Sequence, residues 1–322
     1  STLAPTTTVA VSPSDATSLE RIDRITGDLS PKSVVASGSG LVFAQNMMYT
    51  HTVSVFAADR ALRATISDSV NLSTFGIDGH PGISQGAPVE AAFTSDGRHA
   101  YVSNYSMYGD NWGPEGSDEC EPDDGYDDSF VYRIDAETFE IDQVIGVGSV
   151  PKYVAVTPDD RLTLVTNWCT FDLSIIDNAS AREIQRIPIG RHPRGIVVSN
   201  DSSTAYVAVM GGDVIAKVDL GSFEATDWVW PGDGPRHLVL SPDGDTMYVT
   251  LNSAGQVARI DVELSTVTDT ASTGTHPRTM AIAPDGRALY VVNYDSSTVT
   301  KLAAVDLTEI QTVETDYHPI GI

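Results

Sequence analysis

The sequence contains few cysteines, few basic residues and no long apolar run. Only 2 of its 322 residues are cysteine, and at that length it is not a small disulfide-stapled scaffold. Its 19 Lys and Arg residues face 44 Asp and Glu residues, for a formal net charge of -25. Such a charge argues against broad binding of nucleic acid or anionic lipid, because like charges repel. No apolar run approaches the roughly 18–20 residues of a membrane helix, so we expect no transmembrane segment.

A repeat organises almost the whole chain. Pro151, Pro193, Pro235 and Pro277 each open a similar stretch at intervals of 42 residues, and Pro319 opens a further copy. Two more divergent copies begin at Pro31 and Pro88. We call these seven residues the anchor prolines. A fixed period of this length is typical of solenoids, propellers and repeat arrays.

Each repeat reads as four short strands without helical periodicity. An apolar run follows the anchor proline, and a turn such as Ser-Pro-Asp-Gly leads to a run rich in β-branched and aromatic residues. The third run of the repeat ends in Asp, as at 130–135, 173–177 and 215–219. The fourth run resembles residues 182–189. Four strands repeated about seven times predict an all-β fold, a seven-bladed β-propeller of four-stranded antiparallel blades.

The second run of the repeat carries a family resemblance. It reads YVSN at 101–104, LVTN at 164–167, YVTL at 248–251 and YVVN at 290–293. These motifs resemble the YVTN-repeat β-propellers of surface-layer-like proteins, over nearly the whole chain. The resemblance implies a propeller fold, but it implies little about activity, since the family includes adhesion and scaffold modules and related propellers include lactonases and lyases.

The chain ends predict how the ring closes. Residues 1–18 are rich in Ser, Thr and Pro, as in a linker that follows a removed signal or anchor, and 19–322 form one propeller domain. Residues 19–25 align with fourth-strand residues 181–187, so we expect an N-terminal strand in the last blade. That blade needs further strands, either from residues 6–15 or from residues beyond those given. We favour the second source because Pro13 fits a central strand badly.

Two insertions into the repeat point to one face of the ring. Excess residues lie at 71–87, before the second blade's inner strand, and between Asn104 and Asp135, in a loop between strands two and three. In a propeller both places lie on the same face. Long loops are often functional, so we expect a working surface here, with neutral surface variation as the alternative.

Basic residues recur directly after the anchor prolines. The repeat geometry predicts a ring of cations at the mouth of the central channel, made of Lys32, Lys152, Arg194, Arg236 and Arg278. Such a ring attracts an anionic ligand. The alternative is that each cation pairs with a carboxylate of a neighbouring blade. Four histidines near the anchors, including His237, we expect to cap loops rather than to bind a metal.

The two cysteines lie on equivalent loops of adjacent repeats. Cys120 lies in the second insertion and Cys169 follows the next repeat's second strand, so we predict a Cys120–Cys169 disulfide, with free thiols or a metal pair as alternatives. A disulfide indicates an oxidising compartment, which favours an extracellular or cell-surface location.

The second insertion is strongly acidic. Residues 109–129 hold nine carboxylates and no basic residue. Calcium suits such a loop, although the spacing does not match an EF-hand, so a solvated loop and a calcium site both stay open. No other cofactor is indicated. The candidate ligands are Asp118, Glu121, Asp123, Asp124, Asp127 and Asp128.

Aromatic and thioether side chains accompany the acidic loop. We expect them to form a binding patch on the inserted face, although ordinary packing beneath the insertion is the alternative. The patch comprises Met47, Met48, Tyr49, His51, Tyr105, Tyr108, Trp112 and Trp168.

Two classes of function remain. The first is a non-catalytic binding or scaffold module that holds a partner protein or a cell-wall glycan. The second is a propeller enzyme of the lactonase or lyase type, with a metal or a His/Tyr acid–base pair near the channel mouth. No Gly-x-Ser-x-Gly elbow or HExxH motif is present, and we favour the first class.

Overall fold

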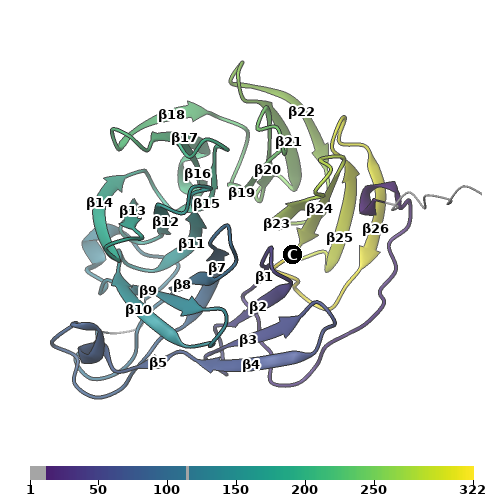
Figure 1. Ribbon diagram of the computed structural model, residues 1–322. Coiled ribbons are helices and arrows are strands. Elements are labelled where there is room, and N and C mark those ends of the chain that lie inside the picture. Colours follow the sequence, from purple (N-terminus) through teal and green to yellow (C-terminus); the bar gives the residue numbers. More distant parts are fainter. Residues whose placement is uncertain (1–11, 114–115) are drawn as a thin grey trace, which may run out of the picture.

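Six four-stranded antiparallel sheets surround a central channel in the described part of the chain, residues 12–113 and 116–322 of a computed structural model (Figure 1). We number these blades one to six in chain order. From the channel outward they are β1 (Ser33–Ala36), β2 (Leu41–Asn46), β3 (Thr52–Ala57) and β4 (Leu62–Ser67); β7 (Pro88–Phe93), β8 (His99–Asn104), β9 (Phe130–Asp135) and β10 (Ile141–Gly146); β11 (Pro151–Val156), β12 (Leu162–Asn167), β13 (Asp172–Asp177) and β14 (Arg182–Pro188); β15 (Pro193–Val198), β16 (Thr204–Val209), β17 (Val214–Asp219) and β18 (Glu224–Val229); β19 (Pro235–Leu240), β20 (Thr246–Leu251), β21 (Gln256–Asp261) and β22 (Thr266–Ser272); β23 (Pro277–Ile282), β24 (Ala288–Asn293), β25 (Thr298–Ala303) and β26 (Glu309–Glu314).

The anchor prolines circle the channel, as the repeat predicts. The inner strands β7, β11, β15, β19 and β23 each begin at an anchor proline, and consecutive strands of this series pack against each other around the channel (Figure 1). The prediction of an all-β propeller with four-stranded antiparallel blades is therefore confirmed.

A β-bulge follows the anchor proline in these five strands. In β11, for example, Pro151 pairs with Asn167 but Tyr153 pairs with Thr166, so one extra residue is inserted. The register shifts after Pro88, Pro193, Pro235 and Pro277 as well. A bulge breaks the strict alternation of side chains between the two faces of a strand, and it bends the strand locally.

The asparagine that ends the second strand fastens that strand to the third. Asn167 is fully buried, and its Nδ2 donates hydrogen bonds to Asp172 Oδ1 (2.6 Å) and Ser174 Oγ (2.8 Å). Asn46 and Asn293 make the corresponding bonds to hydroxyl groups on β3 and β25. Since a buried amide needs hydrogen-bond partners, this pairing explains why the motif ends in Asn.

The core lies between the faces of adjacent blades. Between blades three and four, Leu164, Leu173 and Ile175 pack against Val214, Ala216 and Val218, and all six side chains are buried. In β17 these last three residues alternate along the strand, so one whole face of the blade is covered.

The predicted N-terminal strand does not form. Residues 19–25 lie outside every strand, and ring closure by strand pairing is therefore wrong for this segment. A strand needs a hydrogen-bonded neighbour, whereas only side-chain contacts hold this segment, such as the ion pairs Arg24–Asp316 (2.8 Å) and Arg60–Asp23 (2.9 Å). Of residues 6–15, the part up to 11 lies outside the described residues, and Pro13–Asp15 form the short helix η1.

The two insertions contact each other. The first contains β5 (Ser69–Val70), η2 (Leu72–Phe75) and β6 (Ser84–Gln85), and the second contains η3 (Pro122–Asp124). The His80 and Trp112 rings of the two insertions stack at 3.7 Å. The fourth short helix is η4 (Met210–Gly212). No helix in the described residues is long and apolar enough to cross a membrane.

Candidate functional site in the central channel

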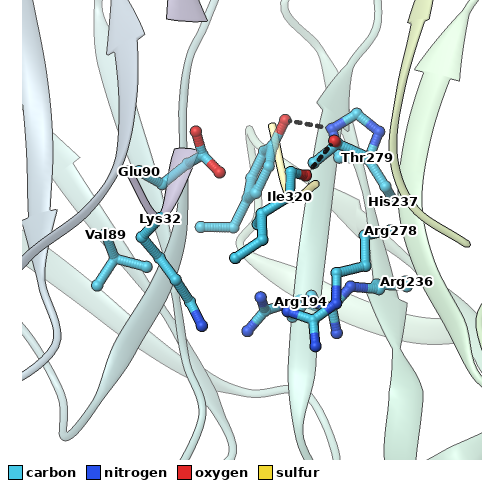
Figure 2. A pocket seen from close by; sticks show the side chains of 10 residues that line it. Lys32, Val89, Glu90, Arg194, Arg236, His237, Arg278, Thr279 and Ile320 are labelled. Carbon is cyan, nitrogen blue, oxygen red and sulfur yellow. Dashed lines mark hydrogen bonds between the residues drawn. The ribbon is translucent and has the colours of Figure 1, made fainter. Parts of the chain in front are cut away.

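A small cavity lies in the channel, lined by the residues that follow the anchor prolines. Because of the bulge, two consecutive residues of an inner strand, such as Arg236 and His237, both line the channel. The cavity volume is ≈ 20 Å³, which is enough for one or two water-sized groups. Its lining, drawn in Figure 2, consists of Lys32, Val89, Glu90, Tyr153, Arg194, Arg236, His237, Arg278, Thr279 and Ile320.

Four cations meet at this cavity without a carboxylate partner. Within the described residues, Lys32, Arg194, Arg236 and Arg278 form no ion pair, although Arg236 is only 8% exposed. Arg278 instead lies over the Tyr294 ring at 3.5 Å, and its buried Nε has no hydrogen-bond partner. The alternative in which each cation pairs with a neighbouring blade's carboxylate does not describe these four residues. Figure 2 shows the arginine head groups gathered at one end of the cavity.

The cations disfavour one another's charge. Burial and the nearby Arg194, Arg278 and Arg236 lower the pKa of Lys32 to about 8. Burial and the charge of Arg278 lower the pKa of Arg194 to about 10. Positive charge held together away from water is costly, and an anion between the groups removes much of that cost.

Three uncharged or weakly charged groups lie at the other end of the cavity. Tyr153 Oη and His237 Nε2 lie 2.9 Å apart. Burial, then Arg236 and Arg194, lower the pKa of His237 to about 3, so its ring is neutral at pH 7. Burial raises the pKa of Glu90 to about 7 and raises that of Tyr153 as well. This end of the cavity thus offers a neutral imidazole, a phenol and a carboxyl group that gains its proton near neutral pH.

The fifth predicted cation behaves differently. Lys152 is 3% exposed, and its Nζ lies 2.5 Å from Asp118 Oδ1 and 4.1 Å from the centroid of the Tyr105 ring. It does not line the cavity. For Lys152, pairing with a carboxylate is the observed arrangement, and the partner comes from the acidic insertion.

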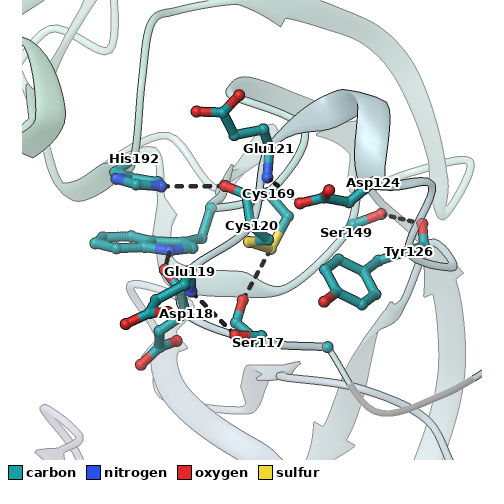
Figure 3. The surroundings of a disulfide bond; sticks show 12 residues. Ser117, Asp118, Glu119, Cys120, Glu121, Asp124, Tyr126, Ser149, Cys169 and His192 are labelled. Carbon is teal, nitrogen blue, oxygen red and sulfur yellow. Dashed lines mark hydrogen bonds between the residues drawn. A yellow bond between two sulfur atoms is a disulfide. The ribbon is translucent and has the colours of Figure 1, made fainter.

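The predicted Cys120–Cys169 disulfide is formed (Figure 3). It attaches the acidic loop to blade three, where Trp168 Nε1 donates to the Asp118 carbonyl oxygen (2.9 Å). His192 stacks on Trp168 at 4.3 Å, with its Nε2 3.2 Å from the Cys120 carbonyl oxygen. The disulfide therefore fixes Asp118 beside the channel cations, and its charge acts on all four of them.

The acidic residues do not converge on one point. Asp118 binds Lys152, Asp124 accepts from the Glu121 amide, and Asp128 pairs with Arg186 (3.0 Å). Asp127 accepts from the Gly113 amide. Across residues 12–113 and 116–322, no group of three or more His, Cys, Asp or Glu side chains could hold a metal ion. The structure thus does not bring the predicted calcium ligands, Asp123 included, together.

The predicted aromatic patch divides into two parts. Six of its members line a surface pocket of ≈ 260 Å³ near blade one, namely Met47, Met48, Tyr49, His51, Tyr105 and Tyr108. Trp112 stacks on His80 between the insertions, and Trp168, 9% exposed, lies under the disulfide loop. The two tryptophans therefore pack against the insertions, which is the alternative given for the patch.

Sequence reasoning missed four of the ten residues that line the cavity, namely Glu90, Tyr153, His237 and Thr279. It named the residue directly after each anchor proline but not the next one, although Glu90, Tyr153 and His237 all hold that second position. His237 in particular was expected to cap a loop and instead lines the channel. A signal was available, because this second position carries Glu, Tyr and His in strands whose next three residues are apolar.

Comparisons with known proteins agree on the fold. The family model described as "Lactonase, 7-bladed beta-propeller" matches residues 256–316. No curated protein matches the sequence. The match spans β21 to β26, so it covers one region of the ring.

Solved propeller structures are similar over most of the chain. A functionally unknown protein from Desulfotomaculum acetoxidans DSM 771 matches with a TM-score of 0.69 at 15% identity, over 90% of this chain and 87% of its own. The Cps50 (Swd1) β-propeller domain of Myceliophteria thermophila gives 0.68 at 10%, over 94% and 92%. Kuenenia stuttgartiensis hydrazine synthase gives 0.56 at 16%, over 89% and 99%. These likenesses show the fold alone, and the YVTN assignment stays a prediction.

Proposed function

We propose that this chain is a non-catalytic binding module of the cell exterior that holds an anionic group of its partner in the central channel. The observation that carries the proposal is the set of four cations, Lys32, Arg194, Arg236 and Arg278, around one cavity without ion-pair partners in the described residues. A guanidinium group away from water needs a hydrogen-bonded counterion, and a ligand's carboxylate or phosphate would supply it.

The size of the cavity limits what enters. A volume of ≈ 20 Å³ admits a small anionic group rather than a whole organic molecule. The rest of the ligand would then lie on the insertion-bearing face, where the ≈ 260 Å³ pocket with Met48 and Tyr49 offers apolar and aromatic surface. A partner protein with an acidic residue or a cell-wall glycan with acidic sugars has this chemistry.

The disulfide supports a location outside the cytoplasm. Both sulfur atoms are buried, with Cys120 and Cys169 each 1% exposed, so the bond is a structural one. Structural disulfides persist in oxidising compartments, which is why we place the protein in the cell envelope or outside the cell.

The experiment is a calorimetric titration of the chain with small anions. Glucuronate and phosphate are the probes, and glucose is the neutral control. The double variant Arg194→Ala/Arg236→Ala should bind at least tenfold more weakly, because it removes two channel cations. The matched control is Arg161→Ala, whose side chain is 80% exposed on the surface. Equal affinity in both variants, or equal binding of glucose, would exclude the channel as the anion site.

A lactonase-type enzyme is the second candidate, because Tyr153 and His237 form a hydrogen-bonded pair in the same cavity. The partial match to the lactonase propeller model points the same way. In lactone hydrolysis water adds to the carbonyl carbon and the ring C–O bond breaks, which leaves a carboxylate and a hydroxyl group. The channel cations would stabilise the developing oxyanion, and Glu90 would accept the proton of the water.

This second candidate is tested by incubating the chain with a panel of lactones and measuring the release of acid by pH-stat titration. Turnover should fall at least 100-fold in Glu90→Gln, while Tyr153→Phe should lower kcat more than it raises KM. If wild-type chain releases no acid from any lactone while it still binds glucuronate, the binding module is the remaining candidate.

A further inference from the structure

The loop between β2 and β3 is one residue longer than its counterparts in blades three to six. It covers residues 47–51 and reads Met-Met-Tyr-Thr-His, whereas the other loops have four residues each, at 168–171, 210–213, 252–255 and 294–297. We call residues 47–51 the blade-one loop. It holds two of the six methionines of the chain side by side, and a histidine follows three residues later. The loop thus combines two thioether groups and one imidazole in a short turn.

The backbone at the end of the blade-one loop follows the repeat. His51 has a left-handed backbone with φ 50°, and Asp213 and Ser297 have φ values of 53° and 54° at the same position before the third strand. Histidine, asparagine and aspartate are among the non-glycine residues that adopt this conformation most readily. The repeat therefore fixes the position of His51, while the residues before it differ from blade to blade.

The His51 ring is held through one of its two nitrogen atoms. Nδ1 lies 2.9 Å from the Gly86 carbonyl oxygen and 3.4 Å from Asp68 Oδ2. Since a carbonyl oxygen can only accept, Nδ1 carries the proton, and in the neutral ring Nε2 carries the lone pair. Within residues 12–113 and 116–322, Nε2 makes no hydrogen bond. The ring is therefore oriented by the protein and keeps one donor nitrogen available for a ligand.

A buried carboxyl group lies on the Nδ1 side of this ring. The side chain of Asp68 is 1% exposed, and among the described residues its one ion-pair contact is with His51. The Asp68 carbonyl oxygen accepts a hydrogen bond from Tyr132 Oη (2.9 Å), which fixes the backbone there. Metal-binding histidines usually donate their other ring N–H to a carboxylate or a carbonyl group, which orients the ring and raises its basicity. His51 has both kinds of acceptor beside Nδ1.

The three candidate ligands share one surface pocket. Met47, Met48 and His51 line the ≈ 260 Å³ pocket together with three tyrosines and Ala87. Met48 is 50% exposed, and the His51 side chain is 25% exposed, so an ion can reach the pocket from solvent. A methionine side chain is unbranched and turns about three bonds, so its sulfur can adapt to a bound ion. The pocket lining contains no carboxylate, so it offers sulfur and nitrogen rather than acidic oxygen.

We propose that Met47, Met48 and His51 form a binding site for copper(I) in this pocket. Thioether sulfur and imidazole nitrogen suit copper(I), whereas calcium and magnesium take oxygen ligands and zinc takes thiolate, imidazole or carboxylate. Both cysteines of the chain are in the disulfide, so no thiolate competes for the ion. The site uses none of the channel cations, so it goes beyond the anion-binding function and does not depend on it.

Anaerobic competition with the copper(I) chelator bathocuproine disulfonate tests the proposal. The wild-type chain should withdraw one copper(I) ion from the coloured chelate. Met47→Leu/Met48→Leu should weaken copper(I) binding about 100-fold, because it removes both sulfur atoms at nearly the same side-chain volume. The matched control is Met210→Leu, at the first position of the corresponding loop in blade four, where Asp213 takes the place of His51. It should bind copper(I) as the wild type does.

Two further variants separate the ligand from its support. His51→Asn keeps a residue that tolerates the left-handed backbone but removes the imidazole, and it should weaken binding about 100-fold. Asp68→Asn should weaken binding about tenfold, as loss of an outer-shell partner does, and should leave sulfur and nitrogen as the copper neighbours in X-ray absorption spectra. Melting curves show that the variants compared are folded.

The outcomes that would overturn the proposal are distinct from those of the anion titration. They are equal copper(I) binding by Met47→Leu/Met48→Leu and Met210→Leu, a copper spectrum without sulfur neighbours, or zinc binding as tight as copper(I) binding. Failure of glucuronate and phosphate to bind would remove the channel function and leave the copper result unchanged.

Discussion

The interface between blades three and four differs from the seam, the region between blade six and blade one where two cavities lie. In blade four, Val214, Ala216 and Val218 of β17 pack against the preceding blade. In blade one, β3 has Thr52, Ser54 and Phe56 at the corresponding positions, and all three line the ≈ 570 Å³ cavity. The difference teaches that the repeat specifies each blade separately, whereas the covering of a face depends on its neighbour.

The largest difference in unfolding free energy should come from truncating a leucine at each of the two places. Leu173→Ala removes a fully buried side chain between blades three and four and should cost about 2–5 kcal/mol of unfolding free energy. Leu62→Ala at the seam removes a 57% exposed side chain and should cost under about 1 kcal/mol. Urea unfolding of both variants measures the contrast, and equal losses would mean that the seam is packed like a blade interface.

The disulfide should stabilise the acidic loop that it attaches to blade three, but not the segment 19–30. Cys120 and Cys169 are 49 residues apart in sequence, and in the chain-entropy model a loop of that size contributes about 4 kcal/mol. Cys120→Ser/Cys169→Ser should therefore lower the melting temperature and speed hydrogen exchange at residues 116–129. Exchange at residues 19–30, which we call the strap, should stay as it was. An unchanged melting temperature would show that the loop is held by other contacts.

The channel should give a smaller, pH-dependent effect. The pKa of Glu90 is about 7 in the folded chain and about 4.5 in a model peptide, so between these pH values the folded state binds more protons than the unfolded state. The contribution of Glu90 to stability should therefore fall by about 1–3 kcal/mol as the pH rises from 4.5 to 7. Glu90→Gln should remove this contribution in urea unfolding at pH 5 and pH 7.5, whereas the fall caused by the raised pKa of Asp68 should remain. An unaltered pH profile would assign it to another group.

The strap should contribute least. Arg24–Asp316 and Arg60–Asp23 join exposed side chains, and pairs of this kind stabilise by under about 1 kcal/mol each. Arg24→Ala and Arg60→Ala should therefore hardly change the melting temperature, and 0.5 M NaCl should remove what effect there is. A loss above about 2 kcal/mol would show that the strap is an integral part of the ring.

The strand positions could be predicted closely because the same strand pattern recurs in several copies of the repeat. The run predicted at 130–135 is β9, and the run at 182–189 is β14 with one residue fewer. The N-terminal strand could not be predicted in this way. Alignment shows that residues 19–25 resemble a fourth strand, but pairing needs a neighbouring strand, and the described chain places none beside them.

The site could be predicted only in part, for a physical reason. The anchor spacing placed Arg194, Arg236 and Arg278 around the channel, and the structure agrees. Regular alternation would turn the next residue away from the axis, so Glu90 and Tyr153 were overlooked. The bulge that turns them inward depends on backbone geometry that the sequence does not spell out.

The bulge after the anchor proline has a consequence for how such rings diversify in evolution. In blades two, five and six it gives two adjacent codons whose side chains reach the channel, while the proline and the strand pairing around them stay the same. A single-nucleotide change at one of these codons can therefore exchange an acid, an imidazole or a guanidinium in the channel without disturbing the sheet. Related rings can in this way acquire unlike ligand preferences on one unaltered scaffold.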